Sequence, residues 1–127
     1  MAALMGVVER VSGPAPAVAD AAIDLHHLSR MTLGERSLER EVLALFDRQV
    51  EILMPRIRDG RPAVVAAAAH TLKGSARGIG AWRVARTAEA VEQAQDSDTP
   101  ELAAAVEALG AAVADAKTAI ASLLRSH

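Results

Sequence analysis

The 127-residue chain has no cysteine and no tyrosine, and it contains one phenylalanine and one tryptophan. Without cysteine there can be no disulfide framework and no thiolate metal site. With two aromatic residues the chain also lacks the stacking platforms that bind single-stranded nucleic acids or flat cofactors. The sequence therefore favours neither a disulfide-stapled domain nor a protein that binds bases by stacking.

The chain also lacks an excess of positive charge and a long apolar run. Its 14 Lys and Arg against 16 Asp and Glu give a net charge of −2, which argues against non-specific nucleic-acid binding. No apolar run approaches the roughly 20 residues that span a bilayer. The N-terminus lacks the positive start and apolar core of a secretory signal. We therefore expect a cytoplasmic protein whose partners are neither nucleic acids nor membranes.

Alanine, the best helix former, is abundant, whereas strand-type alternation is absent. These features predict an all-α protein. The run Ser12-Gly13-Pro14-Ala15-Pro16 is a cluster of structure breakers. It divides the chain into an N-terminal tail or accessory helix, residues 1–19, and one domain, residues 20–127.

One short and four long segments of that domain have helical periodicity. Asp20 or Asp24 can cap the short helix, which we expect to run to about Met31 with Leu25 and Leu28 facing inward. The long segments begin and end as follows: N-cap Ser37 to about Met54, where Pro55 should kink or stop the helix; Pro62 to about Arg77; Ala81 to Gln95; and Pro100 onwards.

Each long segment has an apolar face. In the last one the apolar residues are spaced 4-3-4-3-4-3, which is typical of helices that pack at about 20°. The expected inward residues are Leu38, Val42, Leu45, Phe46, Val50, Leu53 and Ile57; Val84, Ala88 and Val91; and Leu102, Val106, Leu109, Val113, Ala116, Ile120 and Leu123. Four amphipathic helices with short connections predict an antiparallel four-helix bundle, with a short additional N-terminal helix.

His70 is the most informative residue, because histidine is a good neutral nucleophile near pH 7 without a base to activate it. At 100° per residue, its helix face has one imidazole, two cations and little side-chain bulk. That face carries Ala63, Ala66, Ala67, Lys73, Gly74 and Arg77, whereas the opposite face carries Val65, Ala68, Leu72, Ala76 and Ile79. The pattern predicts a histidine that is displayed to a large, negatively charged partner.

The run Ala69-His70-Thr71-Leu72-Lys73-Gly74-Ser75-Ala76 resembles the signature of histidine phosphotransfer (HPt) domains, the phosphocarriers of multistep two-component relays. The likeness covers roughly residues 22–124. It implies that His70 accepts a phosphoryl group from an aspartyl phosphate on a receiver domain and passes it to another response regulator. The implied partners are the receiver domains of response regulators and of hybrid histidine kinases.

The resemblance also gives the neighbours of His70 their roles. Lys73 would neutralise phosphate oxygens, and Gly74 would let a partner backbone approach closely. Further contacts with the partner are expected from Ala66, Ala67, Ser75 and Arg77. The chain itself would need no cofactor and no metal, because the receiver domain would supply Mg²⁺, and we expect a monomer.

Two departures argue against an autonomous kinase. Thr71 stands where sensor-kinase dimerisation domains have a carboxylate, and no glycine-rich nucleotide-binding box is present. A metal site in a four-helix bundle would need Glu-x-x-His pairs, which none of His26, His27 and His70 provides. We interpret His26 and His27 as helix-surface residues. The alternative function is a helical interaction module that binds receiver domains without carrying phosphate.

Overall fold

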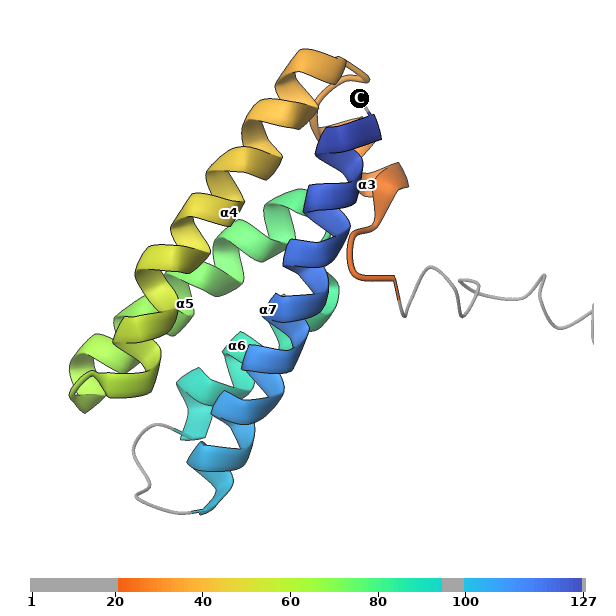
Figure 1. Ribbon diagram of the computed structural model, residues 1–127. Helices are drawn as coiled ribbons and strands as arrows, with labels where there is room; N and C mark the ends of the chain where they lie inside the picture. The colour runs from red at the N-terminus through yellow and green to blue at the C-terminus, as the bar shows by residue number, and fades with distance from the viewer. Residues whose placement is uncertain (1–20, 95–99, 127) are drawn as a thin grey trace, which may run out of the picture.

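The computed structural model describes residues 21–94 and 100–126, which form five α-helices and no strand. The helices are α3 (Leu25–Met31), α4 (Arg36–Asp59), α5 (Pro62–Ile79), α6 (Trp82–Ala94) and α7 (Pro100–Ser126). The four long helices form an antiparallel bundle in which α4 packs on α5 and α7, and α6 packs on α5 and α7 (Figure 1). The short α3 contacts α5 at one end of the bundle. The predicted fold class is confirmed, while the predicted tail, residues 1–19, lies outside the described residues.

The core combines large side chains from all four long helices with many small side chains from α5, α6 and α7. Phe46 and Leu43 of α4 are almost completely buried, as are Leu72, Val84, Leu109 and Ile120. Alanine fills many of the remaining core positions: Ala68, Ala69, Ala76, Ala81, Ala85, Ala88, Ala112 and Ala116. Because the distance between packed helices depends on the side chains at the contact, these alanines allow α5, α6 and α7 to lie close together.

The sequence predicts that α4 kinks or stops at Pro55; the helix does not stop near Met54 but continues through Pro55 to Asp59. Proline removes one hydrogen bond to the preceding turn and crowds that turn. Here Pro55 lies one turn from the end of a 24-residue helix, and its ring is exposed. Met54 and Ile57, on either side of it, are buried in the core, and their packing holds this last turn in place.

Three local predictions are corrected by the structure. Leu45 is 52% exposed, because Leu43 and Phe46 occupy the inward stripe of α4. Leu25 is 53% exposed, because α3 turns only Leu28 into the core. Ser37 is not an N-cap: α4 begins at Arg36 after Glu35, whose side chain makes no capping bond. The chain enters α4 from a turn with two left-handed residues, Leu33 and Gly34, and this turn sets the start of the helix.

A clasp of four residues, Asp24, His27, Gly80 and Trp82, fixes α3 to the turn between α5 and α6. The Asp24 carboxylate accepts hydrogen bonds from the His27 backbone N–H and from Trp82 Nε1, at 3.1 and 2.9 Å. His27 Nε2 lies 3.0 Å from the Arg77 carbonyl oxygen, and the His27 and Trp82 rings meet edge-on. Gly80 closes the turn with φ of 81°, a conformation that favours glycine, and its carbonyl accepts from the Asp24 N–H.

We expect Asp24→Ala to lower the free energy of unfolding by about 1 kcal/mol at neutral pH, the usual loss for an N-cap. The hydrogen bonds from Trp82 and from the His27 backbone lower the pKa of Asp24. The stabilisation is therefore complete above the unfolded pKa and is lost as the pH falls through the folded pKa. Urea unfolding should thus show a gap between wild type and variant that narrows below about pH 4.

The matched control is Glu41→Ala, which removes an exposed carboxylate from α4. It should change the stability by less than about 0.5 kcal/mol. If Asp24→Ala behaves like this control at neutral pH, the clasp does not hold α3.

Candidate functional site

Helix α5 displays His70 on its exposed face, as the sequence predicts. Pro62 lies in the first turn, where a missing N–H costs nothing, and Gly80 caps the C-terminus in the left-handed conformation. Between them, an alanine-rich run favours helix. Val65, Ala69 and Leu72 are buried, whereas the His70 side chain is 68% exposed.

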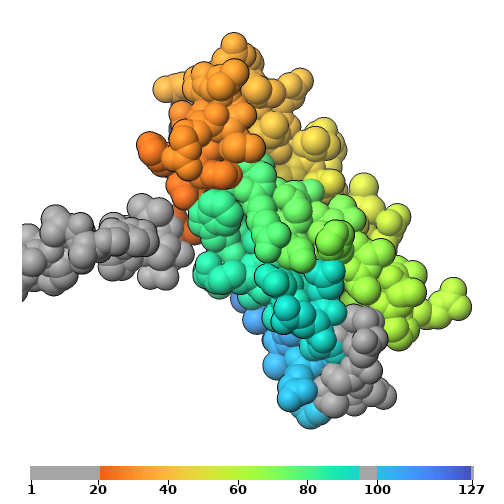
Figure 2. All heavy atoms as spheres, turned by 180° about the vertical axis from the view of Figure 1, so that it is seen from behind, coloured from red at the N-terminus to blue at the C-terminus, as the bar shows by residue number. Residues whose placement is uncertain are grey.

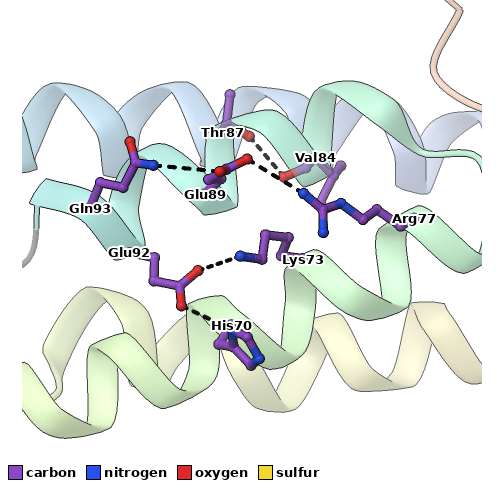
Figure 3. A network of polar contacts seen from close by, with 8 residues as sticks. All are labelled: His70, Lys73, Arg77, Val84, Thr87, Glu89, Glu92 and Gln93. Carbon is purple, nitrogen blue, oxygen red and sulfur yellow. Dashed lines mark hydrogen bonds and ion pairs between the residues drawn. The ribbon is translucent and has the colours of Figure 1, made fainter.

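Glu92 of α6 reaches back to α5 and binds two residues of the His70 face (Figure 3). One carboxylate oxygen, Oε2, lies 2.9 Å from His70 Nδ1, and the other, Oε1, accepts a 2.8 Å hydrogen bond from Lys73 Nζ. The hydrogen bond from Lys73, assisted by that from His70, lowers the pKa of Glu92 although partial burial opposes the shift. Glu92 is therefore an ionised acceptor at neutral pH.

The state of Glu92 fixes the state of the histidine ring. An ionised carboxylate only accepts hydrogen bonds, so His70 Nδ1 must carry the proton that lies between the two groups. In the neutral ring this leaves the lone pair on Nε2. The exposed ring thus has its nucleophilic nitrogen fixed as Nε2.

The two cations of this face are paired with carboxylates. The side chain of Lys73 is only 15% exposed and lies against Glu92. Arg77 Nη2 lies 3.5 Å from Glu89 Oε1, and Gln93 donates a weak hydrogen bond to the other Glu89 oxygen. The two positive charges predicted for this face are therefore balanced by two negative charges from α6. Figure 3 shows these ion pairs between α5 and α6.

Gly74 lies one turn from His70 and is exposed. A Cβ built on it meets no atom within 4 Å, so the packing of the bundle does not require glycine there. On the other side of His70, Ala67 is exposed and Ala66 is half-buried. The backbone of α5 is therefore open to close approach on both sides of the imidazole.

Two hollows lie between α4 and α5 beside this face. The first is lined by Arg56 of α4 and by Ala67 and Thr71 of α5, among others. The second is lined by Leu45 of α4 and Ser75 of α5, among others. Ser75 thus lies in the wall of a hollow, half-buried, rather than on the open surface beside His70.

Three large apolar side chains are exposed on these two helices: Leu45 at 52%, Ile52 at 55% and Val64 at 39%. Leu45 and Ile52 are seven residues apart and share a face of α4, and Val64 lines the first hollow. We refer to these three residues as the apolar face. The two hollows between α4 and α5 adjoin the helix that displays His70. Figure 2 views the molecule from behind and shows α5 and α6 side by side.

Glu92 is the site residue that sequence reasoning missed, because the helix face predicted around His70 contains only residues of its own helix. A signal for it is present in the spacing. His70 lies ten residues before Gly80, and Glu92 lies twelve residues after it. Two helices joined by a tight turn are antiparallel neighbours, so residues at similar distances from the turn lie opposite each other.

Two further classes of site are absent from residues 21–94 and 100–126. In this part of the chain no group of three His, Cys, Asp or Glu side chains is arranged to hold a metal ion. Nor is any of its helices both long and apolar enough to cross a membrane. His26 and His27 lie on α3, where His26 contacts Arg30 and His27 belongs to the clasp.

Fold and site together define an antiparallel helical bundle that displays one histidine beside a carboxylate and an ammonium group. The family model described as the Hpt domain matches residues 41–119, more than half of the sequence, and the chain belongs to this family. Hpt proteins are phosphocarriers rather than kinases, and they interact with receiver domains in phosphorelays. The family thus supports a phosphotransfer role for this chain.

The fold is also that of a solved structure. The X-ray structure of a rice protein assigned as a histidine-containing phosphotransfer protein matches with a TM-score of 0.72 and 20% sequence identity. The match covers 98% of this chain and 93% of the rice chain. No curated protein matches the sequence.

The contact with Glu92 predicts the tautomer of His70. Long-range ¹H–¹⁵N NMR of the neutral ring should show the proton on Nδ1 in the wild-type protein, and a shift toward the Nε2–H form in Glu92→Ala. His26 is an internal control, because its Nδ1 accepts from Arg30 and the ring must carry its proton on Nε2. An Nε2–H form of His70 in the wild-type protein would contradict the orientation that we describe.

Proposed function

We propose that His70 accepts a phosphoryl group on Nε2 from an aspartyl phosphate of a receiver domain and passes it to a second receiver domain. The observation that carries this proposal is the exposed imidazole whose Nδ1 is bonded to Glu92, at 2.9 Å, in a bundle of the Hpt family. The bond leaves the lone pair of Nε2 available for in-line attack on phosphorus. Phosphoryl transfer depends mainly on positioning and on charge stabilisation, both of which this face can supply.

Lys73 is placed to stabilise negative charge during transfer. Its ammonium group is held by Glu92 one helical turn from His70, so it lies beside the ring before a phosphoryl group arrives. A preorganised cation costs no reorganisation when charge develops. Arg77, two turns from His70 and paired with Glu89, has the weaker role of attracting an acidic partner.

The open backbone around His70 suits a partner that is itself a folded domain. In an exchange between two proteins, the receiver must bring its aspartate within bonding distance of Nε2. Gly74 and Ala67 leave room for its loops on both sides of the ring. Any Mg²⁺ in the reaction would come from the acidic pocket of the receiver domain.

The apolar face supplies the docking energy that the small polar site lacks. Leu45, Ile52 and Val64 expose large side chains, and Val64 and Leu45 line the first and second hollow between α4 and α5. Burial of apolar surface is the main favourable contribution to most protein association. The receiver domain would cover this face while its phosphoaspartate meets His70.

The direct test uses a receiver domain labelled with ³²P on its aspartate. Wild-type protein should take up a label that is acid-labile and base-stable, whereas His70→Gln should take up none. Because His70 is exposed, the substitution should leave the helical content and the melting temperature close to wild type. Label on the variant would show that another residue is the acceptor.

Binding of the same receiver to His70→Gln, measured by calorimetry, separates the two candidate functions. If the chain is a phosphocarrier, the wild-type protein takes up the label, whereas His70→Gln takes up none and still binds the receiver with an affinity close to wild type. If the wild-type protein binds the receiver and takes up no label, the chain is a module that binds receiver domains and does not carry phosphate.

We expect Gly74→Gln to slow transfer from the labelled receiver about tenfold or more, which is about 1.4 kcal/mol in the barrier. The added side chain would stand where the partner backbone approaches, and its Cβ would meet no atom of the bundle within 4 Å. The free energy of unfolding should not fall, and it can rise by up to about 1 kcal/mol because glutamine favours helix over glycine.

Gly78→Gln is the matched control. Gly78 lies one turn further along α5, and a Cβ there also meets nothing within 4 Å. It should give a similar change in stability and a smaller effect on transfer. Equal transfer rates for Gly74→Gln and wild type would contradict the role of Gly74 in close approach.

A further inference from the structure

The bond between Glu92 and His70 has a second consequence, which concerns the phosphorylated state and rests on the proposed function. When Nε2 forms a bond to phosphorus, the ring becomes an imidazolium that still carries the proton on Nδ1. The stability of that form depends on the groups around Nδ1. The nearest of these is Glu92 Oε2, at 2.9 Å.

We propose that Glu92 retains the Nδ1 proton throughout the phosphoryl cycle, so that phospho-His70 remains an imidazolium and is always ready to release its phosphoryl group. In the forward step the Nε2 lone pair forms the N–P bond, and the P–O bond of the aspartyl phosphate breaks with its electron pair left on the donor carboxylate. In the onward step an acceptor carboxylate oxygen forms a bond to phosphorus. The N–P bond then breaks, and its electron pair returns to Nε2.

The proton is what makes the onward step easy. From the imidazolium form the ring leaves as neutral imidazole, whereas from the deprotonated form it would have to leave as an imidazolate anion, a much poorer leaving group. If Glu92 holds the proton, neither step needs proton exchange with solvent. The same N–H is present before, during and after transfer.

The charges around the ring favour this assignment. Glu92 has one oxygen for each partner, so the Nδ1–H does not compete with Lys73 for an acceptor. Lys73 itself disfavours a second cation nearby, but it also keeps Glu92 ionised, and its ammonium group bonds to the carboxylate rather than to the ring. Among the residues that the structure describes, further charged groups on this side are Arg77, paired with Glu89 between α5 and α6, and Arg56 of α4, in the wall of the first hollow.

Glu92→Gln separates this role from simple orientation of the ring. The amide oxygen of glutamine can still accept from Nδ1–H, so the ring keeps its tautomer, but the negative charge is lost. An opposite charge in contact typically raises the pKa of a cationic group by one unit or more. We therefore expect the ring pKa of phospho-His70 to be about one pH unit lower in Glu92→Gln than in the wild-type protein.

The measurement is an NMR titration of the full chain after phosphorylation of His70 with phosphoramidate, a small donor that requires no receiver. The second readout is the rate of onward transfer to an unphosphorylated receiver domain as a function of pH. As the pH rises and the phosphorylated ring loses its proton, the transfer rate should fall, and this fall should begin at a pH about one unit lower in Glu92→Gln than in wild type. Glu89→Gln is the matched control, because it removes a carboxylate from the same side of α6 whose partner is Arg77. Its ring pKa should stay at the wild-type value.

Equal ring pKa values in wild type and Glu92→Gln would overturn the proposal, as would a matching shift in Glu89→Gln. Glu92→Ala provides a second test that does not depend on the behaviour of the glutamine amide, and it too should lower the ring pKa. Failure of the proposed function gives a different result. In that case a labelled receiver transfers nothing to the wild-type protein, while the chemically phosphorylated ring still reports on Glu92.

Discussion

The site depends on the antiparallel packing of α5 against α6 about the turn at Gly80. Each residue of the His70 face is on α5, but the carboxylates that organise that face are on α6. Small buried side chains, among them Ala76, Ala85 and Ala88, let the two helices lie close enough for Glu92 to bond to His70 and Lys73 at once. The positions of the two helices thus set the tautomer of the ring, the location of the ammonium group and the local charge balance.

Much of the fold could be predicted from the sequence because a four-helix bundle is encoded locally. The 3.6-residue period of the apolar positions places Leu72, Val84 and Leu109 in the core, and Pro62 and Gly80 delimit α5. Leu45 could not be assigned correctly from the pattern. Leu45 is an exposed apolar side chain next to the inward stripe of α4, and periodicity alone does not separate exposed from buried apolar positions there.

The candidate site also has a part that the sequence predicts and a part that it does not. The face around His70 and the exposure of Gly74 follow from helical geometry, because all of these residues are on one helix. The bonds from Glu92 depend on the register between α5 and α6, which no rule within one helix supplies. For the same reason the sequence predicts the cations Lys73 and Arg77 on the His70 face but not the carboxylate partner that each has on the neighbouring helix.

The clasp that fixes α3 also gives the molecule a natural optical probe. Trp82 is the single tryptophan of the chain, and its indole both meets the His27 ring edge-on and donates a hydrogen bond to Asp24. Its fluorescence therefore responds to the docking of α3, while circular dichroism reports mainly on the four long helices. A change in the first signal without a change in the second would reveal the local opening of this end of the bundle, an event distinct from global unfolding.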